Sequence, residues 1–140
     1  MKTLVLFLAI TAVNYITNAQ NTKEGVTITV TVPNVSNSNG SVLFGLYDET
    51  TFMTAAPIKS AKGKIIDGKT TITFTNVSAG EYGISCVHDA NDNNRMDFED
   101  NGMPIENYGV SNNNMSYGPP MWNDAKFEVG TENLDLEIRF

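Results

Sequence analysis

The residues best suited to chemistry form a dense group of oxygen-bearing side chains at 88–100, where the sequence reads HDANDNNRMDFED. In a twelve-residue calcium loop, positions 1, 3, 5, 9 and 12 carry ligands. Here these positions are occupied by Asp89, Asn91, Asn93, Asp97 and Asp100. Alternate residues of a tight loop can bring their oxygens to one point, and Ca²⁺ takes about six to eight of them. The spacing therefore predicts a Ca²⁺ site made by these five residues, with the backbone carbonyl of Arg95 assisting.

Two residues of this loop differ from the standard calcium loop, and a second interpretation stays open. Asn94 stands where that loop has glycine, and Asp100 has a shorter side chain than the usual glutamate. Asn and Asp side chains also hydrogen-bond to their own backbone, so the same residues are typical of a surface turn without metal. Zinc is disfavoured because one histidine and one cysteine do not supply a tetrahedral set of nitrogen and sulfur ligands.

The histidine indicates an alternative function, that of a hydrolase. His88 with Asp89 or Glu106 has the residue types of the acid–base pair of a hydrolase. Cys86 alternates with Ile84 along a strand-like run, so we expect it in the core, where a thiol is not activated as a nucleophile. We therefore favour a non-enzymatic protein, with the hydrolase as the alternative and a purely structural envelope scaffold as a third interpretation.

The charge balance excludes two classes of partner. The 16 acidic residues against 9 Lys and Arg residues give a net charge of −7, whereas nucleic acid and anionic lipid are bound by basic patches. Six of the acidic residues fall within 89–106, where Arg95 is the one opposing side chain. The negative charge is thus partly concentrated at the predicted cation site, and the partner we expect is a protein, a glycan or another polymer.

Residues 1–19 have the pattern of a cleaved secretory signal. One lysine precedes an apolar run at 4–13, and the small residues Thr17 and Ala19 stand at the −3 and −1 positions of a cleavage site. A transmembrane helix needs about 20 apolar residues, so this run predicts no transmembrane segment. We expect an exported protein of the periplasm or the extracellular space, with a single domain formed by residues 20–140.

Alternating patterns predict that this domain is all-β. Residues 26–32 alternate apolar side chains with threonine, which is typical of a strand with one buried face. Similar runs follow at 41–47, 62–66, 69–75, 82–88, 125–129 and 134–140, and Asp67-Gly68 predicts a hairpin between the third and fourth of these seven runs. About seven short strands predict a single antiparallel β-sandwich, immunoglobulin-like or transthyretin-like. One long irregular loop, residues 89–124, would carry the acidic group.

The second half of that loop is rich in glycine, proline and aromatic residues. Tyr108, Tyr117 and Trp122 have the character of a ligand platform, but aromatic residues in a long loop also serve to pack it against the domain. We favour packing, and the platform stays open.

The chain resembles an exported bacterial family called domain of unknown function 2141. The resemblance rests on the following residues: Gly80-Glu81-Tyr82, His88-Asp89-x-Asn91-x-Asn93, Asp97, Gly102-x-Pro104-x-Glu106-x-Tyr108-Gly109-x-Ser111-Asn112, and Gly118-Pro119-Pro120 to Asp124-Ala125. Asn94 and Val110 depart from the family pattern, which more often has glycine and an aromatic residue there. The resemblance implies an exported β-sandwich with its hallmark at 88–125, and it implies no particular activity. The sequence as a whole predicts a non-enzymatic binding or structural module of the cell envelope with a Ca²⁺-binding loop.

Overall fold

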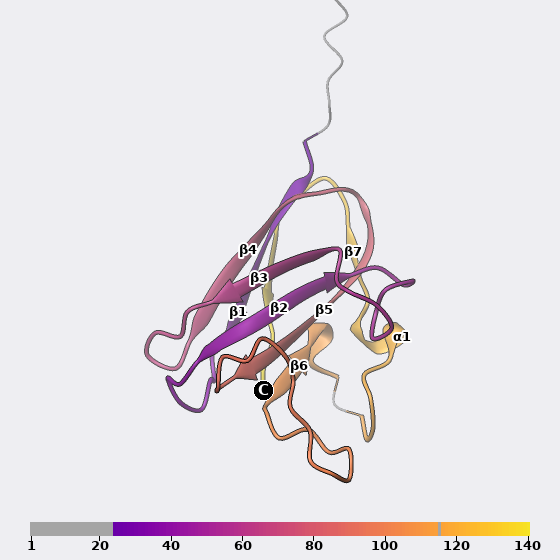
Figure 1. Ribbon diagram of the computed structural model, residues 1–140. Helices are drawn as coiled ribbons and strands as arrows, with labels where there is room; N and C mark the ends of the chain where they lie inside the picture. Colours follow the sequence, from indigo (N-terminus) through magenta and orange to yellow (C-terminus); the bar gives the residue numbers. More distant parts are fainter. Residues whose placement is uncertain (1–23, 115) are drawn as a thin grey trace, which may run out of the picture.

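The computed structural model describes residues 24–114 and 116–140, which form two β-sheets packed face to face (Figure 1). The expected signal at 1–19 lies outside the described residues. The strands are β1 (Val26–Val32), β2 (Ser41–Tyr47), β3 (Lys59–Gly63), β4 (Thr70–Val77), β5 (Gly80–Asp89), β6 (Tyr108–Val110), β7 (Phe127–Val129) and β8 (Leu134–Glu137). The predicted all-β sandwich is confirmed. No helix in these two ranges is long and apolar enough to cross a membrane.

The smaller sheet has the order β4-β1-β8, with β1 in the centre. The predicted alternation of β1 is confirmed, because its four apolar residues are buried and its three threonines are partly exposed. β1 pairs with β4 in the antiparallel sense but with β8 in the parallel sense. This one parallel pair departs from an arrangement that is otherwise antiparallel, as predicted. Strand direction depends on the route of the preceding chain, which an alternating pattern does not record.

The larger sheet has the order β3-β2-β5-β6, and β7 also pairs with β5. β5 is long enough to hold two short strands in succession along one edge: β7 pairs with 80–82 and β6 with 85–87. On the other edge β5 pairs with the whole of β2, from Ser41 opposite Asp89 to Tyr47 opposite Gly83. The end of β5, where the acidic group begins, is thus anchored in the middle of this sheet.

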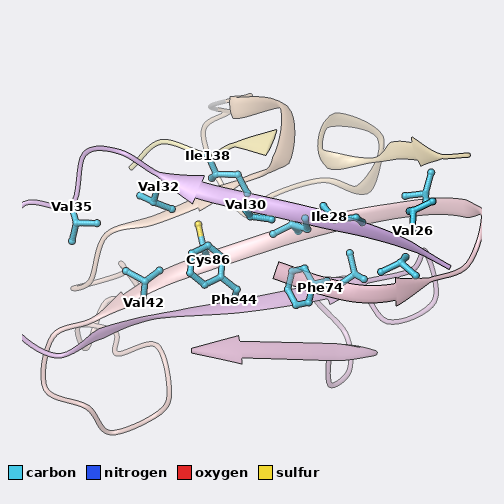
Figure 2. Close-up of a cluster of buried hydrophobic side chains, with 14 of the residues drawn as sticks. Val26, Ile28, Val30, Val32, Val35, Val42, Phe44, Phe74, Cys86 and Ile138 are labelled. Carbon is cyan, nitrogen blue, oxygen red and sulfur yellow. The ribbon is translucent and has the colours of Figure 1, made fainter. Parts of the chain in front are cut away.

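The core lies between the sheets and consists mainly of valine, isoleucine and phenylalanine (Figure 2). Ile28 and Val30 of β1 face Phe44 of β2 across this layer, and all three are almost completely buried. Cys86 is fully buried in the same layer, as predicted. Burial raises the pKa of its thiol, so the reactive thiolate is disfavoured.

The turn predicted at Asp67-Gly68 forms, but the long hairpin predicted around it does not. Both residues have positive φ, 52° and 71°, and the backbones of Ile66 and Lys69 are hydrogen-bonded to each other in both directions. Beyond that bridge the two arms do not pair with each other, because β3 pairs with β2 while β4 pairs with β1 in the opposite sheet. The two arms therefore belong to different sheets, and the local turn does not extend into a ladder.

The predicted irregular loop at 89–124 contains regular structure. Asp89 is the last residue of β5, and the segment also holds β6, the 3₁₀ turn η1 (Ser111–Asn113) and the single helical turn α1 (Trp122–Ala125). β6 is three residues long, which is too short for an alternating pattern to be recognised. Trp122 packs with Phe52 and Val110 in a small second cluster outside the main core. The packing interpretation therefore holds for Trp122, whereas Tyr117 is fully exposed.

Candidate cation-binding loop

Asp89 starts the candidate site and is held rigidly by the end of β5. Its carboxylate is fully buried, and its two oxygens accept the backbone N–H groups of Asn93, at 3.0 Å, and of Asn94, at 2.8 Å. These bonds turn the chain back on itself directly after the strand. Asn94 adopts the left-handed conformation, with φ of 61°, which asparagine tolerates better than most residues. Asparagine in place of glycine is therefore compatible with a tight loop here.

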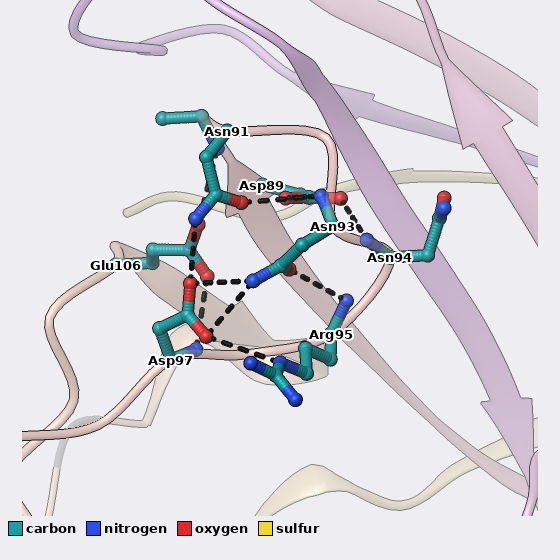
Figure 3. Close-up of polar contacts among 8 residues, drawn as sticks. Asp89, Asn91, Asn93, Asn94, Arg95, Asp97 and Glu106 are labelled. Atoms are coloured by element: carbon teal, nitrogen blue, oxygen red, sulfur yellow. Dashed lines mark hydrogen bonds and ion pairs between the residues drawn. The ribbon is translucent and has the colours of Figure 1, made fainter.

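Asn91, Asn93 and Asp97 are brought together on one side of this loop (Figure 3). The side-chain amide of Asn91 donates to Asp97 Oδ2 at 2.8 Å, and that of Asn93 donates to both oxygens of Asp97 at 2.9 and 2.7 Å. Arg95 Nε lies 3.3 Å from the same carboxylate. The hydrogen bond from Asn91, then that from Asn93 and the charge of Arg95, lower the pKa of Asp97.

The side-chain oxygens of the two asparagines also have partners. Asn91 Oδ1 accepts the backbone N–H of Asn93, and Asn93 Oδ1 accepts that of Arg95, both at 3.1 Å. These are the local Asx turns that the second interpretation predicted. The side chains of Asn91 and Asn93 therefore already have hydrogen-bond partners, and a cation would have to replace some of these bonds.

Glu106 joins this group from the segment just before β6. Its Oε1 accepts the backbone N–H of Ala90 and its Oε2 that of Asp97, each at 3.1 Å. The carboxylate therefore connects the beginning and the end of the loop (Figure 3). The calcium-loop spacing did not indicate Glu106 as a cation ligand, because it lies beyond the twelve-residue frame.

Asp100 lies apart from the other four predicted ligands. It is exposed in a turn where Gly102 N–H donates to Glu99 O at 2.8 Å and Glu99 N–H donates to Met103 O at 2.8 Å. Within the described ranges, no hydrogen bond connects Asp100 to the group around Asp97. The structure thus brings together Asp89, Asn91, Asn93 and Asp97 and adds Glu106.

A second contact ties the loop to the sheet. Lys62 Nζ of β3 lies 3.0 Å from Asp92 Oδ1 and donates to Asn94 Oδ1 at 3.1 Å, while Ser41 Oγ donates to the same Asp92 oxygen at 2.8 Å. The hydrogen bond from Lys62 and that from Ser41 lower the pKa of Asp92. Asp92 is thereby directed toward β3.

His88 is not placed as the hydrolase alternative requires. A cleft of about 610 Å³ is lined by His88 together with Asp97 and Glu106, but the histidine is 3% exposed. Its Nε2 lies 2.8 Å from the carbonyl oxygen of Asn39, and its ring stacks on that of Phe140. Among the hydrogen bonds of the described residues, none joins the His88 ring to a carboxylate. The geometry gives this alternative no support.

The chemistry available here is oxygen coordination. Within residues 24–114 and 116–140, no group of three or more His, Cys, Asp or Glu side chains is arranged to hold a metal ion. A metal would therefore need the amide oxygens of Asn91 and Asn93 in addition to the carboxylates. Such an all-oxygen set suits a hard cation such as Ca²⁺ better than zinc or copper.

Comparison with known proteins gives one match. The model of a family described as "Uncharacterized protein conserved in bacteria (DUF2141)" matches residues 30–137, which include every strand from β2 to β8 and the whole candidate site. No curated protein and no solved structure matches the chain. Because the matched segment is well over half of the 140 residues, the chain belongs to this bacterial family, as its motifs predicted.

Proposed function

We propose that this protein is an exported, non-enzymatic β-sandwich module in which the loop that follows β5 binds Ca²⁺ and is stabilised by it. The observation that carries the proposal is the gathering of Asp89, Asn91, Asn93 and Asp97 on one short loop. The carboxylate of Glu106 accepts the backbone N–H of Asp97, and the guanidinium of Arg95 is the one cationic group beside the Asp97 carboxylate among the described residues. A bound cation would offset this excess of negative charge.

The present hydrogen bonds indicate how the loop would accept the ion. The amide groups of Asn91 and Asn93 already face the carboxylate of Asp97. Rotating each amide by half a turn would exchange its nitrogen for its oxygen, so that both amide oxygens and Asp97 would face one point. The cost is the loss of two Asx-turn hydrogen bonds and of the three hydrogen bonds that the two amides donate to Asp97. We therefore expect weak binding, with a dissociation constant of about 10⁻⁴–10⁻³ M, in the range of extracellular calcium modules.

Titration of the purified protein with Ca²⁺ and Mg²⁺, followed by calorimetry and thermal unfolding, tests the proposal. We expect Ca²⁺ to stabilise the protein by about 1.4 kcal/mol at ten times its dissociation constant, with a smaller effect of Mg²⁺. Asp97→Asn should abolish the stabilisation, whereas Asp135→Asn, an exposed residue of β8, should retain it. Unchanged melting of the wild-type protein at millimolar Ca²⁺ would refute the site.

Two further variants test whether Glu106 or Asp100 is the additional carboxylate ligand of Ca²⁺. Asp100 was predicted from the calcium-loop spacing, while Glu106 is the carboxylate that lies beside Asp97. We expect Glu106→Gln to weaken Ca²⁺ binding more than Asp100→Asn does. The reverse order would mean that the turn at 99–102 folds back onto the ion, as the twelve-residue frame requires.

The proposed location is the cell envelope, where the loop end of the sandwich would contact a protein, a glycan or another polymer. The basis is the signal pattern at 1–19 together with membership of a bacterial family. Cell fractionation and N-terminal sequencing provide the test. An exported chain that begins at Gln20 supports the proposal, and an intact N-terminus in the cytoplasmic fraction contradicts it.

A further inference from the structure

The outer face of the larger sheet, on the side away from the core, carries an apolar cavity of about 1140 Å³. Its floor is made by side chains of neighbouring strands, which the register arranges in two rows across the sheet. One row runs through Lys62, Leu43, Val87 and Tyr108, and the next through Ser60, Gly45 and Ser85. Ser60 and Ser85 of the second row have small side chains, which leave a trough between the side chains of the first row and the surrounding loops.

Loops from both sides form the walls of this trough. Met96, Phe98 and Met103 belong to the segment between β5 and β6, while Met53 and Pro57 belong to the connection between β2 and β3. Several of these apolar side chains are half exposed, including Phe98 at 56% and Met103 at 61%. Exposed apolar side chains gathered around a cavity are typical of a binding site, and methionine adapts its shape to different ligands.

The floor of the trough at Gly45 is covered by an aromatic ring. A side chain at Gly45 would collide with the ring of Tyr47, because its Cβ would lie 2.6 Å from that ring. The Tyr47 ring therefore lies over Gly45 and adds a flat aromatic surface to the trough. This arrangement suits a slender hydrocarbon chain, because binding becomes more favourable as more apolar surface is removed from water.

The position of the one charged side chain of the lining indicates which head group the ligand carries. Among the described residues that line the cavity, Lys62 carries the one formal charge, in a protein whose net charge is −7. Lys62 stands at the β3 end of its row, and its side chain is 48% exposed. Its ammonium has three donors, of which Asp92 and Asn94 take two. A cation at one end of an apolar trough complements a molecule with an anionic head and an apolar tail.

We propose that this trough binds a carboxylic acid with an unbranched hydrocarbon tail, whose carboxylate contacts Lys62 and whose tail crosses β2 and β5 toward Tyr108. Four strands spaced by about 4.8 Å give the trough a length of about 14 Å, which accommodates a medium-length chain. Asp92 competes for the same ammonium, so the ligand shares Lys62 with it. The trough contains none of the proposed Ca²⁺ ligands, but its wall residues Met96 and Phe98 flank Asp97 in the same loop.

Titration with decanoate and, in parallel, with uncharged 1-decanol tests this inference. Amide NMR spectra are recorded on the ¹⁵N-labelled protein, with EDTA present so that calcium soaps do not form. We expect decanoate to shift the resonances of Gly45, Ser85 and their neighbours, and to bind more tightly than 1-decanol. Shifts that map elsewhere, or no saturable shifts, would overturn the proposal.

Three variants test the role of the charge. Lys62→Met should weaken decanoate binding about two- to five-fold, the scale of a solvent-exposed ion pair, and leave 1-decanol binding unchanged. Asp92→Asn removes the competing anion and should strengthen decanoate binding by a similar factor. Lys64→Met removes a lysine of the same segment that does not line the cavity, so it serves as the matched control. Equal decanoate affinity for the Lys62 and Lys64 variants would overturn the carboxylate-headed ligand.

Discussion

The side chain of Glu106 accepts the backbone N–H of Asp97 at 3.1 Å, although nine positions of the sequence separate the two residues. The other oxygen of Glu106 accepts the N–H of Ala90, so one carboxylate closes the loop between β5 and β6. The loop therefore has a scaffold of its own that does not require a cation. This scaffold and the proposed cation site use the same residues, so stability without metal and stabilisation by Ca²⁺ require separate measurements.

Glu106→Ala should lower the free energy of unfolding by about 1–2 kcal/mol, because two backbone donors lose a charged acceptor at a partly exposed site. Glu106→Gln retains one carbonyl oxygen and should cost less. Urea unfolding in the presence of EDTA measures both effects. Glu99→Ala, in the exposed turn nearby, is the control and should change stability by less than about 0.5 kcal/mol; an equal loss in Glu99→Ala would contradict the role of Glu106.

Asp89→Ala should be more damaging. The Asp89 carboxylate is fully buried and satisfies the N–H groups of Asn93 and Asn94, and each buried donor left without a partner costs about 1–3 kcal/mol. We expect a loss of about 2–4 kcal/mol, again by urea unfolding without metal. Asp100→Ala, at an exposed turn position, should be close to neutral. A neutral Asp89→Ala would mean that the loop refolds around the missing carboxylate.

The stability of the protein should fall in acid. The pKa of Asp92 is lowered by its hydrogen bond from Lys62, and that of Asp97 by its hydrogen bond from Asn91. A carboxyl whose pKa is lower in the folded state stabilises the protein above its unfolded pKa of about 3.9 and loses this effect as the pH falls through the folded value. The free energy of unfolding should therefore decrease below about pH 4.

Variants identify the carboxylates responsible for that decrease. Asp92→Asn and Asp97→Asn each remove one titrating group, so each should make the dependence of unfolding free energy on pH less steep in this range. Asp135→Asn, at an exposed position of β8, should leave it unchanged. Urea unfolding at a series of pH values gives the slopes of the wild type and the three variants. Equal slopes in the wild type and both loop variants would show that these two residues do not contribute.

Gly63→Ala should destabilise the protein because β3 passes very close to the start of β4. A Cβ at this position would lie 2.2 Å from Thr70 Oγ1, and overpacking of this kind costs about 1–3 kcal/mol. Thermal unfolding measures the loss. Gly130→Ala is the control, because a Cβ there meets no described atom within 4 Å; comparable losses in both variants would show that a steric clash at Gly63 is not the cause.

Cys86 should be unreactive in the folded protein. The thiol is fully buried and its pKa is raised by that burial, so both access and thiolate formation are disfavoured. A thiol reagent such as Ellman's should modify it only at the rate of unfolding, and completely in urea. Rapid modification of the native protein at neutral pH would contradict the described packing of the core.

The sequence determined the strands and the faces that they bury. Alternation at 26–32 and the apolar runs around Phe44 and Cys86 specify which side chains enter the core, because side chains of a strand point alternately to its two faces. The spacing from Asp89 to Asp97 likewise indicated four residues that the structure brings together. Both patterns are local, and neighbours along the chain suffice to recognise them.

Tertiary structure alone decided the partners of these elements. The separation of β3 from β4, the parallel pairing of β8 and the placement of Glu106 beside Asp97 all join residues distant in sequence. No local pattern encodes them, because they depend on which apolar faces are buried together when the two sheets pack. The trough beside Lys62 arises in the same way, since its floor comes from four strands and its walls from loops on both sides.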